Sequence, residues 1–416
     1  MSQLHKKFSN DQVKAILRNY HAGQMTRQHA QELLGIGKSR FFTLLQLYRA
    51  DPTSMSIEYQ RKPTGRINAE TDHLIRQELK REKNLVEDER LPILSYNYTA
   101  LRDRLQKKGV TVSVPTIIKR AIEEDCYQPR RKQKVHDRLV VTSAVGEMIQ
   151  HDASVHLWSP LAAEKWTLIT SLDDYSRLLL FADFFAHETS WAHIQAAQTV
   201  LVKNGLPVRY YVDNLRVFRF IQKRDSFWRN HVLETDDADP QWRQVMRVLN
   251  VGVTYALSPQ AKGKIERPFR WLQDRIVRTC ALEGISSCDD ARMVLRAEVD
   301  RYNHHQIHST TGEVPAMRFE KAKTSGNSLF RPFSLPKPYS SLKDVFCLHT
   351  RRTLNGYRKI TLSGMEMEIP KVPIREDVDI HLVPLTSSLV EIRIWFENKM
   401  VHSLTLPVDK FPGVHF

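Results

Sequence analysis

Cysteine is scarce in this sequence, and long apolar runs and a leading signal segment are absent. Its 416 residues include only four cysteines, and none has the paired spacing of a disulfide framework or a zinc site. We therefore expect neither kind of site, and a reducing compartment fits this cysteine usage best. Without a signal peptide or an apolar stretch long enough to cross a bilayer, the sequence predicts a cytoplasmic protein with no membrane contact.

Acidic residues are outnumbered by basic ones. Lysine and arginine total 62 against 47 aspartates and glutamates, which gives a formal net charge of +15 and a pI near 9.6. Such a balance favours a polyanionic partner, and nucleic acid is the commonest one. A basic surface kept for solubility is the alternative. With 41% hydrophobic residues, the chain has enough apolar material for about two to four domains.

The first part of the chain predicts a helix-turn-helix module. Apolar spacing indicates helices at 11–17, 26–34 and 38–49, with Thr26 as a helix cap and a glycine turn at 35–37. Three polar residues at the start of the third helix are the candidates for contacts with DNA: Lys38, Ser39 and Arg40. A small bundle that contacts only protein is the alternative.

A second helix-turn-helix module is predicted further along, with helices at 70–83, 96–108 and 114–124. Basic residues in this module and in the segments on either side of it are further candidates for DNA contacts: Arg61, Arg66, Lys119, Arg120, Arg130, Arg131 and Lys132. The basic segments at 61–66 and 130–134 are equally compatible with plain solvated linkers.

Strands and helices alternate in the middle of the chain. Strands are predicted at 147–153, 165–173, 178–185, 208–212 and 252–256, and helices at 188–204, 263–283 and 288–304. This order is typical of a mixed α/β sheet. Beyond a loop at 324–341, short alternating segments predict a small all-β barrel with strands at 345–348, 358–362, 365–369, 378–382 and 390–395.

Three carboxylates stand at informative places in the central region. Asp152 lies in its first strand, Asp213 ends another strand, and Glu266 opens a helix. Acids placed in this way can converge, and their hard oxygen atoms suit Mg²⁺ or Mn²⁺. Taken singly, each has an ordinary explanation, since aspartates often end strands and the helix dipole favours a glutamate in the first turn.

Taken together, these acids and their surroundings resemble the DDE-type transposases and integrases of the retroviral integrase superfamily, and bacterial insertion-sequence transposases above all. The segments that carry the resemblance occur in family order: 148–154, 172–177, 213–214, 258–267, and 302–315 with Tyr302, Asn303, His308 and Pro315. It covers roughly residues 140–320. The resemblance implies an RNase H-like core in which Asp152, Asp213 and Glu266 are the catalytic residues and hold two Mg²⁺ or Mn²⁺ ions.

The resemblance also implies a function for the whole chain. A transposase would bind the terminal repeats of a mobile element, cut its 3′ ends and join them to target DNA, as a homo-oligomer assembled on DNA in the bacterial nucleoid. Lys264 and Arg267 flank Glu266 and would hold substrate phosphates. Whether a helper ATPase takes part is open. The domains expected are helix-turn-helix modules at 1–62 and 63–135, the catalytic core at 136–325, and the barrel at 340–416.

Two departures from the family pattern leave alternatives open. Asp213 and Glu266 lie further apart than usual, and we assign the excess to a charged surface insertion at about 219–241 that contacts DNA and carries Trp228, with Trp242 beside it. Leu215 stands where glycine is usual. A metal-dependent nuclease of the same fold that does not join DNA, and a domesticated DNA-binding regulator with an inactive core, remain the competing functions.

Overall fold

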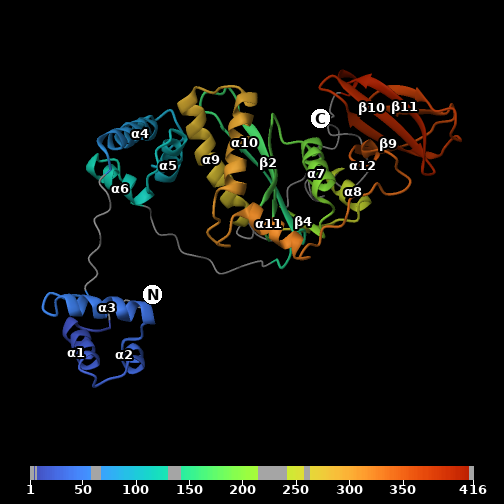
Figure 1. Ribbon diagram of the computed structural model, residues 1–416. Coiled ribbons are helices and arrows are strands. Elements are labelled where there is room, and N and C mark those ends of the chain that lie inside the picture. The colour runs from blue at the N-terminus through green and yellow to red at the C-terminus, as the bar shows by residue number, and fades with distance from the viewer. Residues whose placement is uncertain are drawn as a thin grey trace. The chain divides into compact units, whose positions relative to one another are not determined.

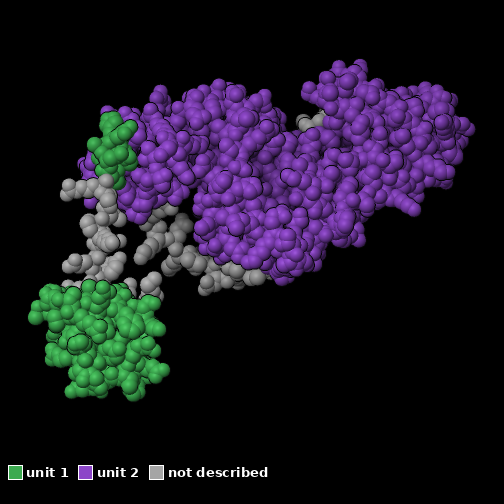
Figure 2. All heavy atoms as spheres, viewed as in Figure 1, with its two compact units in different colours: residues 1–73 green, residues 74–416 purple. Residues whose placement is uncertain are grey.

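The computed structural model describes residues 4, 7–57, 67–129, 142–213, 241–256 and 263–411, apart from the side chains of Gly263 and Lys264. Contacts divide the chain into two compact units, Met1–His73 and Leu74–Phe416 (Figure 2). Several predicted DNA-contacting residues lie outside the described residues: Arg61, Arg66, Arg130, Arg131 and Lys132. The same holds for most of the expected insertion, residues 219–240, and for Trp228 within it.

The first unit contains a three-helix bundle. Its helices are α1 (Asn10–His21), α2 (Arg27–Leu34) and α3 (Lys38–Ala50), close to the predicted positions. Thr26 caps α2 as expected, since its side chain accepts a hydrogen bond from the backbone N–H of His29. Gly35 ends the helix with a φ of 62°, which glycine adopts without strain. The helices enclose an apolar core: Val13, Leu17, Ala30, Leu34, Phe41, Leu44 and Leu45.

A second group of three helices follows, α4 (Ala69–Glu87), α5 (Tyr98–Lys107) and α6 (Val114–Glu123). All three were predicted within a few residues, and Asn97 and Ser113 cap the last two. In the second unit these helices lie beside a long helix of the central region, α9 (Gly263–Glu283), as Figure 1 shows.

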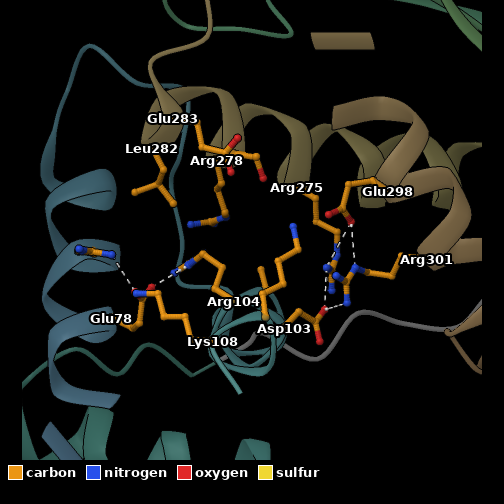
Figure 3. Close-up of a pocket in the computed structure, with 14 residues that line it drawn as sticks. Glu78, Asp103, Arg104, Lys108, Arg275, Arg278, Leu282, Glu283, Glu298 and Arg301 are labelled. Atoms are coloured by element: carbon orange, nitrogen blue, oxygen red, sulfur yellow. Dashed lines mark hydrogen bonds and ion pairs between the residues drawn. The ribbon is translucent and has the colours of Figure 1, made fainter. Parts of the chain in front are cut away.

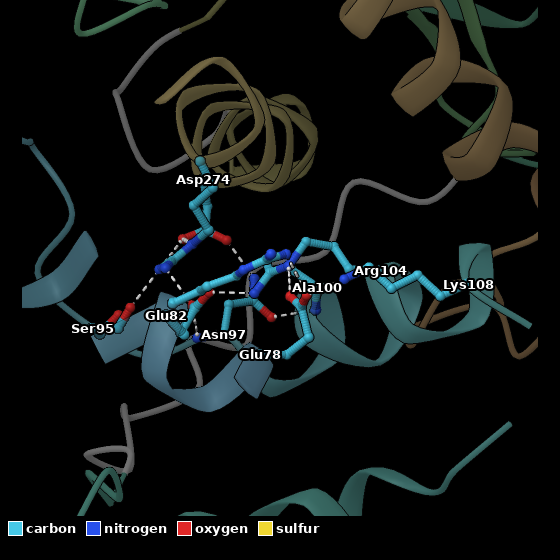
Figure 4. Close-up of polar contacts among 10 residues, drawn as sticks. Glu78, Glu82, Ser95, Asn97, Ala100, Arg104, Lys108 and Asp274 are labelled. Carbon is cyan, nitrogen blue, oxygen red and sulfur yellow. Dashed lines mark hydrogen bonds and ion pairs between the residues drawn. The ribbon is translucent and has the colours of Figure 1, made fainter. Parts of the chain in front are cut away.

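Buried ion pairs join this helical group to α9 (Figure 4). Glu82 is fully buried and binds Nη1 of Arg278 at 2.5 Å and Nη2 of Arg104 at 2.7 Å. The neighbouring Glu78 binds Nε of Arg104 at 3.0 Å and Nζ of Lys108 at 2.6 Å. Charged groups at an interior contact are stable only when each has its partner, so α4 and α5 are tied to one position on α9.

A second ion-pair group lies close by and borders a cavity of about 470 Å³ (Figure 3). Nη1 of Arg275 lies 2.7 Å from Oδ2 of Asp103 and 3.4 Å from Oε2 of Glu298, and Arg301 pairs with the same two acids. Both acids and bases line the cavity, but the bases outnumber the acids, so its wall is basic on balance.

The central region forms one mixed five-stranded sheet. Its strands are β1 (Met148–His156), β2 (Trp166–Asp173), β3 (Leu179–Phe185), β4 (Arg209–Val212) and β5 (Gly252–Tyr255). They lie in the order β3-β2-β1-β4-β5, with β1, β2 and β3 antiparallel and β1, β4 and β5 parallel. This mixed α/β sheet fits the predicted RNase H-like core.

Helices cover both faces of this sheet. Consecutive residues of a strand project from opposite faces of a sheet. In β2, Leu168 packs with residues of α9 and α10 (Cys288–His304) on one face. Ile169 packs with α7 (Ser190–Asn204) on the other face. An unpredicted helix, α8 (Gln241–Val248), lies on the α7 side. α11 (Pro315–Thr324) follows α10. No helix in the described part of the chain is long and apolar enough to span a membrane.

The carboxy-terminal region is all-β apart from two short helices, α12 (Leu342–Val345) and η3 (Val408–Lys410). Its strands are β6 (Leu348–Thr353), β7 (Lys359–Leu362), β8 (Met365–Glu368), β9 (Asp377–Pro384), β10 (Leu389–Phe396) and β11 (Lys399–Pro407). They pair as a four-stranded sheet, β11-β10-β9-β6, and a separate hairpin of β7 and β8. The pairings among the described strands do not confirm a closed barrel.

Two details of this region differ from the prediction. The strand expected at 345–348 is α12 followed by the start of β6, because Ser341 and Asp344 form a reciprocal capping box that starts a helical turn. The last strand, β11, was not predicted. The apolar face of the sheet joins the cluster under α7 and α8, where Ile380 and Val390 belong to the same core as Trp242.

Candidate active site

The pairing of β1 with β4 brings two of the three predicted acids together. The parallel register pairs Gln150 with Tyr211, and Asp152 and Asp213 lie two residues further along their chains. Neighbouring strands are about 4.8 Å apart, and residues two positions apart share a face. Asp152, in the middle of β1, and Asp213, directly after β4, therefore stand side by side just beyond the point where the pairing of the two strands ends.

Both acids lie on the face of the sheet that α9 covers. Asp152 is paired with Thr170 of β2, which is two residues from Leu168 and Leu172 and shares their face. Those leucines pack with Ile265 and Leu272 of α9. Each of the two acids is partly buried rather than enclosed, so this end of the strands is accessible from outside.

The direction of α9 sets where Glu266 lies along β1. Nε2 of Gln273 in α9 lies 2.9 Å from Nε2 of His156, the last residue of β1. Just after the ends of β1 and α9, the hydroxyl of Ser159 donates to the carbonyl of Ile285 at 2.5 Å. α9 therefore runs in the same direction as β1. Glu266 precedes Gln273 by two helical turns, about 10 Å, which corresponds to about three strand residues before His156 and so to the neighbourhood of Asp152.

The carboxylate of Glu266 is not turned fully toward the other two. It is exposed, and Arg270 lies one turn along α9 with its Nη2 3.7 Å from Oε2 of Glu266. Within the described residues, the three acids do not form a group whose ligand atoms all lie within 4.8 Å of one another. Like charges repel at short range, which favours the outward position of Glu266 unless a cation lies between the acids. The exposed ion pair with Arg270 is worth at most about 1 kcal/mol, so it adds little to the energy of turning Glu266 inward.

A buried polar network supports the strand next to Asp152. Nε2 of Gln150 donates to Oδ1 of Asp174 at 2.5 Å, and Asp174 also accepts from Thr142 and from Nη1 of Arg177 at 3.0 Å. The adjacent Asp173 accepts from the backbone of Gly146 and from Ser176. Burial raises the pKa of Asp173 despite these bonds. Both aspartates thus hold the turn after β2.

Positive charge gathers near the start of α9, around His308. Burial first, and then the charges of Arg177, Arg267 and Arg318, lower the pKa of His308 to about 4. The imidazole is therefore neutral near pH 7, among three permanently charged guanidiniums. Nη1 of Arg267 also donates to Oγ1 of Thr310 at 2.9 Å. Such a group can bind an anionic oxygen beside the acids.

His308 and Arg318 were not among the candidate site residues, although His308 lies in a segment that carries the resemblance. Arg177 likewise belongs to such a segment, yet no local feature of the sequence marks it for this role. They come from three separate places, Arg177 from the turn between β2 and β3, His308 from the turn after α10, and Arg318 from α11, so only the fold brings them together.

On the opposite face of β1, His151 packs in the core rather than facing the site. Its Nδ1 lies 2.8 Å from Oγ of Ser171, its Nε2 lies 2.8 Å from Nδ1 of His193, and its ring stacks on Trp242. Trp242 is fully buried in α8. Trp242 was expected beside a surface insertion that contacts DNA, and this expectation is wrong. The residue lies on the apolar face of α8 and packs in the core.

The predicted DNA-contacting residues that are described lie in several places. Lys38, Ser39 and Arg40 are exposed at the start of α3. Lys119 is exposed on α6, whereas Arg120 is partly buried and its Nη1 binds Oε1 of Glu123 at 3.0 Å. The side chain of Lys264 lies outside the described residues.

Comparison with known proteins gives two curated relatives, and no family model matches the chain. The chain is 28% identical over 245 residues to a protein of Sinorhizobium fredii described as a transposase, y4bF, a match that covers 59% of this chain and 49% of that relative. It is also 28% identical over 171 residues to the transposase for insertion sequence IS1202 of Streptococcus pneumoniae, covering 41% and 35%. These matches thus span about half or less of either relative, and they confirm the predicted resemblance to transposases.

Solved structures give weaker likenesses. A chain of the simian T-cell lymphotropic virus intasome, in complex with a PP2A regulatory subunit, shows 13% identity and a TM-score of 0.36, covering 74% of this chain and 92% of that one. The magnesium complex of the HTLV-2 integrase catalytic core domain shows 14% identity and a TM-score of 0.30, covering 42% and 95%. Likenesses at this level do not establish the fold.

Proposed function

We propose that this relative of transposases is a DNA transposase that binds the ends of a mobile element, cleaves their 3′ strands and joins them to target DNA. The observation that carries the proposal is the pairing register that sets Asp152 beside Asp213, with α9 running along β1 on the same face. An acid pair on neighbouring parallel strands, with a third acid at the start of the adjacent helix, suits attack on a phosphodiester.

The donor atoms of the site fit Mg²⁺ or Mn²⁺. Asp152, Asp213 and Glu266 offer only carboxylate oxygens, the ligands that these ions prefer. Two bound ions would activate the attacking oxygen and stabilise the leaving oxygen. The chain's own contribution is to hold two acids on the rigid strands β1 and β4 and the third on α9, where release from Arg270 lets Glu266 turn toward them.

The basic group beside the acids has a complementary role. Arg177 and Arg267, with neutral His308 between them, present donors to the phosphate that is attacked and orient it toward the acids. Arg177 is also anchored to Asp174 and through it to Gln150 of β1. This anchoring fixes the distance between the phosphate-binding group and the strand that carries Asp152.

The helical modules would supply recognition of the element ends. In the first module, the start of α3 presents Lys38, Ser39 and Arg40 to solvent, as a recognition helix requires. Because a transposase acts on paired ends, the working form is a homo-oligomer assembled on DNA. The second module adds Lys119 as a further exposed contact.

The test is a cleavage and joining assay on labelled element ends. The full chain is incubated with Mn²⁺ and oligonucleotides taken from the borders of the element, with pre-cut ends in a second reaction. We expect metal-dependent nicking in the first reaction and joined products in the second. Asp152→Asn and Glu266→Gln should lower both rates by at least about a hundredfold, in the range of losing a main source of charge stabilisation.

A matched control lies on the same helix. Glu283→Gln changes an exposed glutamate at the far end of α9 and should leave both rates unchanged. Nicking without joined products would identify a nuclease of this fold. Activities that are the same in Asp152→Asn and in the unaltered chain would instead leave a DNA-binding regulator as the function.

A further inference from the structure

A cysteine and two histidines meet in the carboxy-terminal sheet, far from the three acids in sequence. The side chains of Cys347, His349 and His381 offer ligand atoms that all lie within 4.8 Å of one another. Sγ of Cys347 lies 3.4 Å from Nε2 of His349, and the two imidazole rings have centroids 4.5 Å apart. Within the described residues, no other group of three or more His, Cys, Asp or Glu side chains brings its ligand atoms this close together.

The strand register explains why these residues meet. His349 of β6 and His381 of β9 are direct partners in the antiparallel pairing, and side chains at such partner positions project from the same face of a sheet. Cys347 precedes His349 by two residues and so reaches the same side. β6 and β9 therefore hold the two histidines, and Cys347 lies in the bend directly before β6.

Burial of these side chains favours a ligand role over simple packing. Cys347 is fully buried and His381 is 2% exposed, yet Nδ1 of His381 has no hydrogen-bond partner. A buried polar atom without a partner costs about 1–3 kcal/mol. The rings of Tyr339 and Trp395 lie 5.8 Å and 5.7 Å from that of His381, and packing of this kind holds the imidazole in one orientation.

We propose that Cys347, His349 and His381 bind one Zn²⁺ ion. A thiolate with two imidazoles is a donor set that selects zinc over Mg²⁺, which prefers oxygen. The thiol of Cys347 now donates to the carbonyl of Asp344 at 3.6 Å. On binding, its S–H bond is broken, a Zn–S bond forms and the proton leaves to solvent.

Zinc usually takes four ligands, and a nearby cavity can supply the fourth. His349 and His381 line a polar cavity of about 340 Å³, together with Thr350 and Asp379. A water molecule from this cavity completes the coordination. A water molecule in the fourth position makes this site more open than a structural zinc site with four protein ligands. Its three protein ligands nevertheless belong to a sheet and not to a cleft of catalytic residues.

The position of the site gives the ion a structural role. Gln241 at the start of α8 binds the backbone of His349 in both directions, with Nε2 donating to its carbonyl at 2.8 Å and Oε1 accepting from its N–H at 2.5 Å. An ion that holds His349 to His381 would therefore also stiffen the contact between the carboxy-terminal sheet and α8. Because α8 packs on the central sheet, the ion would stabilise the joint between the two regions.

Cobalt is the probe that tests this proposal, because a Co²⁺–thiolate bond absorbs in the near ultraviolet whereas oxygen-bound Co²⁺ does not. The full chain, without a histidine tag, is stripped with a chelator and titrated with Co²⁺ in excess Mg²⁺. We expect a thiolate band that saturates at one ion per chain and disappears when Zn²⁺ is added. Zn²⁺ should also raise the thermal midpoint of unfolding.

Variants identify the ligands. Cys347→Ser should abolish the band, and His381→Gln should weaken Zn²⁺ binding by at least about tenfold. Cys126→Ser removes another buried cysteine and should leave both readouts unchanged. Asp152→Asn should also leave the band intact, so failure of the transposase proposal would not affect this one. Absence of the band in the unaltered chain, or its persistence in Cys347→Ser, would overturn the site. If circular dichroism shows that a ligand variant does not fold, the titration of the unaltered chain still decides the proposal.

Discussion

The two three-helix modules use different residues to hold their helices in place. The first, α1–α3, encloses apolar side chains such as Leu17, Phe41 and Leu44, all at most 2% exposed. The second, α4–α6, buries Glu78, Glu82 and Asp103 almost as completely, at 1%, 0% and 4%. The second module also encloses apolar side chains, such as Leu79 and Leu101 at 0%. Within the described residues, the two modules therefore differ in the buried acids that only the second contains.

This difference indicates how each module depends on the rest of the chain. The apolar core of the first consists of residues of its three helices together with Leu4 and Met55 beside them, and the module belongs to a separate compact unit. The buried acids of the second find part of their cations on α9, at Arg275 and Arg278. Because a buried charge without its partner is strongly unfavourable, the second module has its stable form only against the central region.

Breaking the buried charge network should have the largest effect. Glu82→Gln removes the charge that faces both Arg278 and Arg104, and a buried charge left without its counterion costs about 3–5 kcal/mol. We expect the free energy of unfolding of the second unit to fall by this amount in urea titrations. Glu87→Gln is the control, since Glu87 lies on the same helix, is exposed and pairs only loosely with Lys83 at 3.8 Å. Equal stability of the two variants would contradict the dependence on α9.

Breaking the apolar core of the first module should cost somewhat less and stay local. Leu44→Ala leaves a cavity among Leu17 and Phe41 and should cost about 2–3 kcal/mol. Amide hydrogen exchange should show lost protection within α1–α3 and unchanged protection in α4–α6. The matched control is Leu47→Ala on the exposed side of α3. Loss of protection in both modules would show that the first is not self-sufficient.

Local features allowed most helices and strands to be predicted from the sequence. The spans predicted at 263–283 and 288–304 agree with α9 and α10, because apolar spacing and a cap such as Ser287 act within a few residues. The surface insertion was placed at about 219–241, and no helix was predicted at 241–248, where Trp242 of α8 is buried. The predicted strand at 345–348 was wrong because one capping box outweighed the preference of its apolar residues for strands.

Contacts between distant residues could not be predicted in the same way. Glu82 and Arg278 look like solvent-facing residues of two unrelated helices, and only the fold pairs them. The strands beside Asp152 and Asp213 were predicted, although β1 extends to His156 beyond its predicted end at 153. The parallel register that makes the two acids neighbours was not predicted. We expected no zinc site because paired cysteines are missing, yet Cys347, His349 and His381 meet through strand pairing, which leaves no spacing pattern in the sequence.

Acid should weaken the second module through Glu78. Burial alone would raise the pKa of Glu78, but the hydrogen bonds and charges of Lys108 and Arg104 outweigh it and lower the pKa below the ordinary value of 4.5. A lowered folded-state pKa means that the stabilisation is complete above pH 4.5 and is lost as the pH falls through the folded value. Glu78→Gln should flatten this dependence of the unfolding midpoint, whereas Glu283→Gln should not. Identical acid profiles for Glu78→Gln and the unaltered chain would contradict the assignment.

Substitutions at the exposed start of α3 should have the smallest effect on stability. The charged side chains there take no part in the apolar core of the first module, so they are available for binding. Lys38→Ala and Arg40→Ala should each change the free energy of unfolding by no more than about 0.5 kcal/mol. Each should nevertheless lower the slope of log affinity for element-end DNA against log salt by about one, the signature of a lost phosphate contact. Arg49→Ala, at the other end of the same helix, should leave the slope unchanged. A uniform loss for all three variants would mean that only net charge matters, and α3 would then have no recognition end.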